Sequence, residues 1–203
     1  NYNPNEPMMP ASEHPVSDAD SLKGKLILAM PQMTDPRFDR AVLVMLEHHA
    51  SGAMGLIVNK ELRGVAFSDL LEQLEIKPSA EATIDCPVLF GGPVEIGRGF
   101  ILHSTDKMLP QSVALSEQVA VTTLLEMLDH IAHGTGPKDM LFCLGYAGWT
   151  AGQLDEEIRD NAWLYAPLSA EILFQLPADK RWDGAMALAG VNPDFLATDA
   201  GHA

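Results

Sequence analysis

Apolar residues gather in short continuous runs along this chain, separated by clusters of Gly, Pro, Asn, Asp and Ser. Runs of about four to eight apolar residues are typical of strands buried on both faces. They predict strands at residues 25–30, 41–46, 54–59, 88–90, 99–103 and 118–121, whereas residues 108–116 fit neither state clearly. Only a turn at Ser51-Gly52 separates the second run from the third, so we expect an antiparallel hairpin there.

Helical periodicity marks another set of segments. The first is an amphipathic helix whose apolar face would consist of Phe67, Leu70, Leu71 and Leu74. The next is expected to begin at a capping box between Thr123 and Glu126. Its buried residues would be Leu124, Leu125, Leu128, Ile131 and Ala132. Residues 169–176 and 181–189 are also predicted to be helical.

The most unusual stretch of the chain lies at residues 140–163. An apolar run at 140–144 leads into three closely spaced glycines and then into an acidic amphipathic segment. We predict a buried strand, a glycine turn and a helix opened by a capping box between Thr150 and Gln153. The turn would contain Gly145, Gly148 and Gly152.

The helix predicted after these glycines has two different faces. Its apolar face would consist of Ala151, Leu154, Ile158 and Ala162. Its acidic face would consist of Gln153, Glu156, Glu157 and Asp160. Asp155 and Arg159, four residues apart, stand in the favourable order for an ion pair. Residues 163–168 then predict an edge strand, because Pro167 cannot donate a ladder hydrogen bond.

Together these elements predict one α+β domain with a mixed, largely antiparallel sheet and flanking helices. The domain would span residues 23–190, and a chain of 203 residues is long enough to bury one sizeable core. Residues 1–22 are rich in Pro, Asn, Ser and acids without an apolar period, which predicts a disordered N-terminal tail. Residues 191–203 are predicted to form a C-terminal tail.

The formal net charge of -15 is the strongest feature of the composition. It argues against direct binding to DNA, RNA or an anionic membrane, because phosphate contacts need Lys and Arg. A basic protein partner fits it better. Two cysteines give neither a disulfide framework nor zinc spacing, and no secretory signal or membrane span is evident, so we expect a cytoplasmic protein.

Candidate catalytic groups each have a simpler structural interpretation. Cys143 could be a reactive thiolate, but inside an apolar run a cysteine usually packs as a small hydrophobe. His48, His49 and His103 could gather around a metal, although adjacent histidines on a strand point to opposite faces. The carboxylates on the acidic helix face are better explained as solvated charges. We therefore assign no catalytic residue, no metal and no cofactor.

The glycines before the acidic helix also have two interpretations. A helix N-terminus that follows a glycine turn can bind an anion. Here no lysine follows the glycines, and the spacing is not that of a dinucleotide fingerprint. Close packing of the strand against the helix is the favoured interpretation.

Several segments in this order resemble the AlgH/YqgE family of bacterial proteins. They are GKLILAMPQMTDPRFDRAVLVMLEH from Gly24, GAMGLIVNK from Gly52, LFGGPVEIGRGFILH from Leu89, GYAGWTAGQLDEEIRDNAWL from Gly145, and the segment 182–190. The resemblance implies a compact α+β fold with a folded-over mixed sheet and a cytosolic location. It carries over no enzymatic activity and no catalytic residue. Some members are labelled transcriptional regulators, but this chain has no basic recognition helix, so a regulatory effect would pass through a protein partner.

Three functional hypotheses follow. The favoured one is a regulatory or interaction module without catalysis, in which Glu156, Glu157 and Asp160 meet a basic partner. The alternative is a small-molecule-binding protein or enzyme, with a pocket near the two glycine-rich motifs. Direct DNA binding is the third. The candidate ligand or partner residues are Asn59, Gly91, Gly92, Pro93, His103, Gly148, Trp149, Gln153, Glu156 and Glu157.

Overall fold

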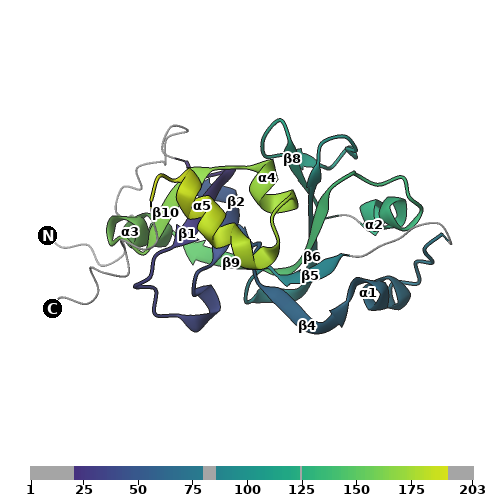
Figure 1. Ribbon diagram of the computed structural model, residues 1–203, viewed down its shortest axis with the longest axis horizontal. Coiled ribbons are helices and arrows are strands. Elements are labelled where there is room, and N and C mark those ends of the chain that lie inside the picture. Colours follow the sequence, from purple (N-terminus) through teal and green to yellow (C-terminus); the bar gives the residue numbers. More distant parts are fainter. Residues whose placement is uncertain (1–20, 80–85, 124, 192–203) are drawn as a thin grey trace, which may run out of the picture.

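The computed structural model describes residues 21–79, 86–123 and 125–191 of the chain (Figure 1). Its strands are β1 (Lys25–Ala29), β2 (Val42–His49), β3 (Gly52–Ile57), β4 (Glu61–Ala66), β5 (Pro87–Phe90), β6 (Val94–Ser104), β7 (Val113–Ala114), β8 (Val119–Thr122), β9 (Met140–Thr150) and β10 (Trp163–Pro167). Its helices are α1 (Phe67–Gln73), α2 (Leu125–Ala132), α3 (Gln153–Arg159), α4 (Ala170–Phe174) and α5 (Arg181–Leu188). Short 3-10 turns lie at Pro36–Phe38 and Ala178–Lys180.

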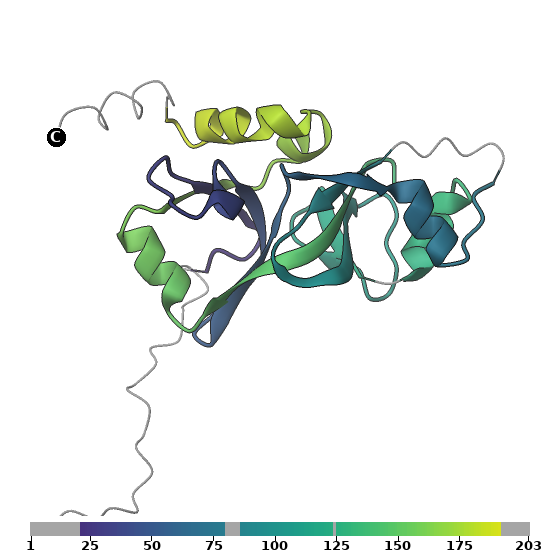
Figure 2. The ribbon, with the colours of Figure 1, turned by 90° about the horizontal axis from the view of Figure 1, so that it is seen from below.

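Strand β9 joins two halves of one curled sheet. The strand order is β10-β1-β2-β3-β9-β6-β8-β7, and β5 pairs with both β4 and β9. The first half of β9 pairs with β5 and β6, and its second half pairs with β3. Figure 2 shows β9 running from one half into the other. Every pairing is antiparallel except β5 with β9, so the predicted α+β fold with a mixed, largely antiparallel sheet is confirmed.

Three apolar clusters hold the fold together, and alternation along the strands decides which cluster each residue joins. In β1, Leu26 and Leu28 face the central cluster that α4 and α5 cover, whereas Ile27 and Ala29 face the cluster beneath α3. A strand buried on both faces carries an unbroken apolar run, which explains the pattern seen in the sequence. The third cluster lies under α1 and α2 and includes Phe142 of β9.

The predicted glycine turn is present at Gly152, but the prediction is wrong for Gly145 and Gly148. Strand β9 continues through Gly145 and Gly148 as far as Thr150, and the chain turns only before α3, where Gly152 has a φ of 73°. Gly145 has a φ of 76°, which lets the strand buckle without losing its partners on either side. Of the predicted capping box, one half is present, because the Thr150 N–H donates to Gln153 Oε1 at 3.0 Å.

The structure also differs from the predictions where the spacing of apolar residues did not indicate how exposed a side chain is. Strand β4 was not predicted, because its side chains are mostly exposed and carry no apolar alternation. Leu125, predicted to be buried in α2, is 61% exposed. Leu22, placed in the predicted N-terminal tail, is buried and contacts the cluster beneath α3. The predictions for residues 1–20, Leu124 and 192–203 lie outside the described residues.

Most of the remaining predicted elements are confirmed. The β2–β3 hairpin forms, and β10 is an edge strand that pairs with β1 alone. Helices α1, α4 and α5 lie where the periodicity placed them, and Ser169 caps α4 through its hydroxyl. Within the described ranges, every helix is too short or too polar to cross a bilayer.

Candidate functional site

The two glycine-rich motifs of the predicted pocket do meet, but they leave no space between them. Gly91 donates its N–H to Leu144 O at 2.8 Å and accepts a hydrogen bond from Ile57 N–H. A methyl group on Gly91 would overlap Gly145 O, and one on Gly92 would overlap the backbone of Tyr146. These glycines therefore allow close backbone packing, and no ligand fits between the two motifs.

Asn59, another residue of the predicted pocket, holds the loop that precedes β2. Its Oδ1 accepts a hydrogen bond from Val42 N–H at 2.8 Å, and its Nδ2 donates to Arg40 O at 2.8 Å. Arg40 has a φ of 51°, an uncommon conformation for a residue with a side chain. Both ends of the Asn59 amide are thus occupied in stabilising this conformation.

His103 is fully buried and forms part of a one-way chain of hydrogen bonds. Its Nδ1–H donates to Ser104 O at 2.8 Å, so the neutral ring accepts at Nε2 from the Thr122 hydroxyl at 2.7 Å. Thr122 in turn accepts from the Ser112 hydroxyl at 2.7 Å, and Ser112 accepts from Leu109 N–H at 2.9 Å. Burial lowers the pKa of His103 and favours this neutral form. The ring is therefore a structural group without a free nitrogen.

Cys143 is packed rather than reactive. Its side chain is fully buried, its Sγ lies 3.8 Å from Ile57 O, and burial raises its pKa to about 12. At pH 8 the thiol therefore stays protonated, and the protonated form is not the nucleophile. We expect iodoacetamide at pH 8 to label the half-buried Cys86 in the native protein, and to label Cys143 only after denaturation. Equal labelling rates in the native protein, measured by peptide mass spectrometry, would contradict this assignment.

The acidic face of α3 is only partly free. Glu156 is exposed, but Glu157 is half-buried and accepts a hydrogen bond from Trp149 Nε1 at 3.0 Å. Burial raises the pKa of Glu157, although the Trp149 indole opposes that shift. Trp149 packs edge-on against Trp163, with ring centroids 6.0 Å apart, and Gln153 binds Thr150. Glu157 and Gln153 thus hold α3 to β9, whereas Glu156 and Asp160 are exposed.

The predicted Asp155–Arg159 ion pair does not form. Asp155 Oδ1 instead lies 3.1 Å from Nε2 of His48, which is buried in β2. His49, the next residue, points to solvent and contacts Glu47, so the two histidines face opposite sides as predicted. His48, His49 and His103 consequently belong to separate surroundings.

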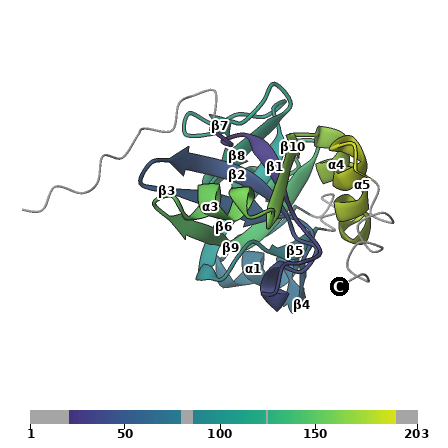
Figure 3. The ribbon, with the colours of Figure 1, turned by 90° about the vertical axis from the view of Figure 1, so that its left-hand side faces the viewer.

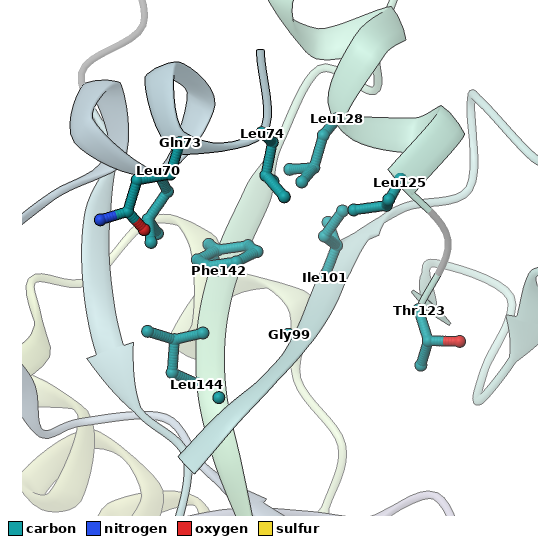
Figure 4. A pocket seen from close by; sticks show the side chains of 11 residues that line it. Leu70, Gln73, Leu74, Gly99, Ile101, Thr123, Leu125, Leu128, Phe142 and Leu144 are labelled. Atoms are coloured by element: carbon teal, nitrogen blue, oxygen red, sulfur yellow. The ribbon is translucent and has the colours of Figure 1, made fainter. Parts of the chain in front are cut away.

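An apolar groove between α1 and α2 was not predicted from the sequence. Its floor is formed by β6 and β9, and it has a volume of about 200 Å³. Figure 4 shows Leu70 of α1 and Leu74, which follows α1, on one side, Leu125 and Leu128 of α2 on the other, and Phe142 between them. The residues that line it are Leu70, Gln73, Leu74, Gly97, Gly99, Ile101, Thr123, Leu125, Leu128, Phe142 and Leu144.

The groove stays open because large side chains stand at its edges and glycines stand on its floor. Leu74 is 41% exposed and Leu125 is 61% exposed. Two glycines of β6, Gly97 and Gly99, contribute no side chains to fill the space. Apolar side chains this exposed at the mouth of an apolar hollow are typical of an interaction site.

One end of the groove is acidic. Past Leu70, Gln73 and Gly97 it continues into a shallower hollow that Asp69 and Glu72 of α1 also line. Both carboxylates are exposed. The only sequence signals for this site were the apolar spacing of α1 and the capping box before α2, and each predicted a buried face rather than a groove between helices.

Comparison with known proteins identifies the family. The model of the AlgH-like family matches residues 26–194. A UPF0301 protein of Paracoccus denitrificans is 43% identical over 191 residues, which are 93% of this chain and 100% of that protein. The chain belongs to the AlgH-like family. A UPF0301 protein of Jannaschia sp. is 45% identical, over 90% of this chain and 95% of the relative.

Two solved structures share the fold of this AlgH-like chain. The AlgH protein from Pseudomonas aeruginosa, determined in solution, is 41% identical with a TM-score of 0.70, covering 92% of this chain and 98% of that one. A crystal structure of a Corynebacterium diphtheriae protein has a TM-score of 0.65 at 19% identity, over 82% and 86% of the two chains, so it supports the fold alone. The resemblance found in the sequence is thereby confirmed.

Proposed function

We propose that this AlgH-like protein is a binding module whose groove between α1 and α2 receives an apolar segment of a partner protein. The observation that carries this proposal is the groove itself, with Leu74 and Leu125 exposed at its edges above the buried Phe142. A regulatory effect would then be exerted through the partner, without contact between this acidic chain and DNA.

The groove has the dimensions and lining of a site for a few large side chains. A volume of about 200 Å³ accommodates one or two leucine-sized groups. Helices on both sides and a sheet below would surround such groups on three sides, as in the recognition of an amphipathic helix by a groove. Burying one leucine or phenylalanine side chain contributes roughly 1.5–3 kcal/mol, so two anchors contribute roughly 3–6 kcal/mol of the about 8 kcal/mol that micromolar binding requires, and further contacts around the groove must contribute the rest.

The charge beside the groove selects among such segments. Asp69 and Glu72 would attract Lys or Arg residues next to the apolar anchors and would repel an acidic segment. The net charge of -15 acts in the same direction over a longer range. The proposed partner is therefore a basic amphipathic segment. The sequence analysis placed a basic partner at the acidic face of α3, and we now propose that such a partner binds at the groove instead.

Selection from a random peptide library tests the proposal. Peptides are enriched on the full chain and depleted on a variant that carries Leu74→Ser and Leu125→Ser together. Both side chains are exposed, so the double variant should fold normally. Enriched peptides should carry spaced large apolar residues with Lys or Arg, and should bind the double variant at least about tenfold more weakly.

Leu188→Ser is the matched control, because Leu188 is 46% exposed on α5, outside the groove. It should leave peptide affinity unchanged. Asp69→Asn with Glu72→Gln should slow association and flatten its dependence on salt. Enriched peptides that bind the double variant as well as the parent protein, or that are acidic, would refute the proposed site.

A further inference from the structure

A second hollow lies on another side of the molecule, between α3 and the paired strands β1 and β10. Figure 3 looks onto this side, with α3 in front of the sheet. The hollow has a volume of about 310 Å³, and none of its lining residues lines the groove between α1 and α2. It is lined by Leu22, Lys25, His48, Asp155, Ile158, Arg159 and Tyr165.

A buried histidine fixes the carboxylate at this hollow. Leu22 N–H donates to Nδ1 of His48 at 2.9 Å, so the proton of the neutral ring stands on Nε2. That Nε2–H donates to Asp155 Oδ1 at 3.1 Å. The His48 side chain is 1% exposed and the Asp155 side chain is 37% exposed. In the described parts of the chain, no other donor reaches Asp155, which leaves Oδ2 available to a ligand.

Two cations line the same hollow, and no carboxylate of the described residues forms an ion pair with either of them. Lys25 Nζ lies 5.3 Å from the centre of the Tyr165 ring. Arg159 makes no ion pair or hydrogen bond with any residue in the described ranges. Asp155, four residues before it, accepts a hydrogen bond from His48 instead. A planar guanidinium can bind a carboxylate through two parallel hydrogen bonds. Arg159 is therefore available for such a contact.

The remaining walls are apolar. Ile158 of α3 and the ring of Tyr165, which is 55% exposed, contribute surface without charge. A purely anionic ligand would be repelled by the carboxylate of Asp155, and a purely cationic ligand would be repelled by Lys25 and Arg159. A ligand that carries both charges, close together and next to an apolar group, matches all of these walls.

We propose that this hollow binds a free α-amino acid. The ligand carboxylate would lie against Arg159 and Lys25, and its ammonium would donate to Asp155, which His48 holds in place. Its side chain would rest on Ile158 and the Tyr165 ring. This site is independent of the groove and of its proposed peptide partner.

Titration of the full chain with free amino acids tests this site. Each of the natural L-amino acids is added up to about 10 mM, a limit that detects millimolar binding, while backbone amide shifts are followed by NMR. At least one should shift the amides of residues 21–25 and 155–165. Its N-acetyl derivative, which lacks the ammonium, and its decarboxylated amine should each bind at least about tenfold more weakly.

Arg159→Gln should weaken the same amino acid at least about tenfold, and Lys25→Gln should weaken it by a smaller factor. Arg63→Gln is the matched control, because Arg63 is an exposed cation on β4, outside this hollow. No shift with any amino acid, shifts confined to the groove, equal binding of the N-acetyl derivative, or full binding by Arg159→Gln would each overturn the proposal.

Discussion

Replacing Gly145 by alanine should lower the free energy of unfolding by roughly 2–5 kcal/mol. Gly145 is buried with a φ of 76°, and an added methyl group would overlap Gly92 O and press on Val94 O. Neither obstacle is a flexible side chain, so the strands β6 and β9 would have to separate. Urea denaturation followed by tryptophan fluorescence measures the change.

The variant Gly152→Ala separates two causes of the stability loss in Gly145→Ala, which are steric overlap and the left-handed backbone conformation. Gly152 has a φ of 73°, nearly the same conformation, but apart from its chain neighbours no heavy atom of the described residues lies within 4 Å of the position that a methyl group would take. The free energy of unfolding of the Gly152→Ala variant should fall by only roughly 1–2 kcal/mol, which is the cost of placing an alanine in the left-handed conformation. Equal losses in the two variants would show that Gly145 serves conformation alone, and the close approach of the two glycine motifs would then have no energetic importance.

Thr122→Val should lower the free energy of unfolding by roughly 2–4 kcal/mol, although valine has almost the same shape as threonine. The Thr122 hydroxyl both donates to His103 Nε2 and accepts from the Ser112 hydroxyl. Its removal leaves the buried His103 Nε2 without a donor, which costs about 1–3 kcal/mol, and leaves the half-buried Ser112 hydroxyl without its acceptor, at a smaller cost. Thr34→Val, at an exposed loop position, is the control and should change stability little.

The effect of Thr122→Val should also depend on pH. Burial lowers the pKa of His103 below its usual value near 6.5, so the unfolded chain takes up a proton before the native protein does. Stability should therefore fall as the pH drops from about 6.5 toward the lowered pKa. In Thr122→Val the neutral ring has lost its donor, so the pKa should rise and the difference between the two proteins should shrink below about pH 6. A constant difference across this range would contradict the hydrogen-bond chain.

Several residues of the predicted candidate site have partners within the fold, for one physical reason. Asn59, Gly91, Gly92 and His103 were chosen because their residue types are unusual in strands and turns, and each proves to be occupied by backbone or side-chain partners far away in sequence. A polar or glycine residue at a strand end can contact either a ligand or a backbone group that is distant in sequence. The sequence does not show which of the two it contacts, because only folding brings the distant group to that position.

The groove was missed for the opposite reason. Leu70 and Leu74 lie about seventy residues from Phe142 in the chain, and each was assigned to a buried face by its local period. Helical spacing reports which side of a helix is apolar, not how far the neighbouring helix stands from it. Only the packing of α1 and α2 on β6 and β9 leaves Leu74 and Leu125 exposed.

By itself the sequence determined the strands of β1, β2, β3 and β5, the hairpin, the helices and the opposite faces of His48 and His49, because each depends on the alternation or spacing of nearby side chains. It also carried the family resemblance. The tertiary structure decided that β9 continues as a strand through Gly145 and Gly148, that Asp155 binds His48 rather than Arg159, and where the hollows lie. These features depend on partners distant in the chain, whose hydrogen bonds and packing override local preference.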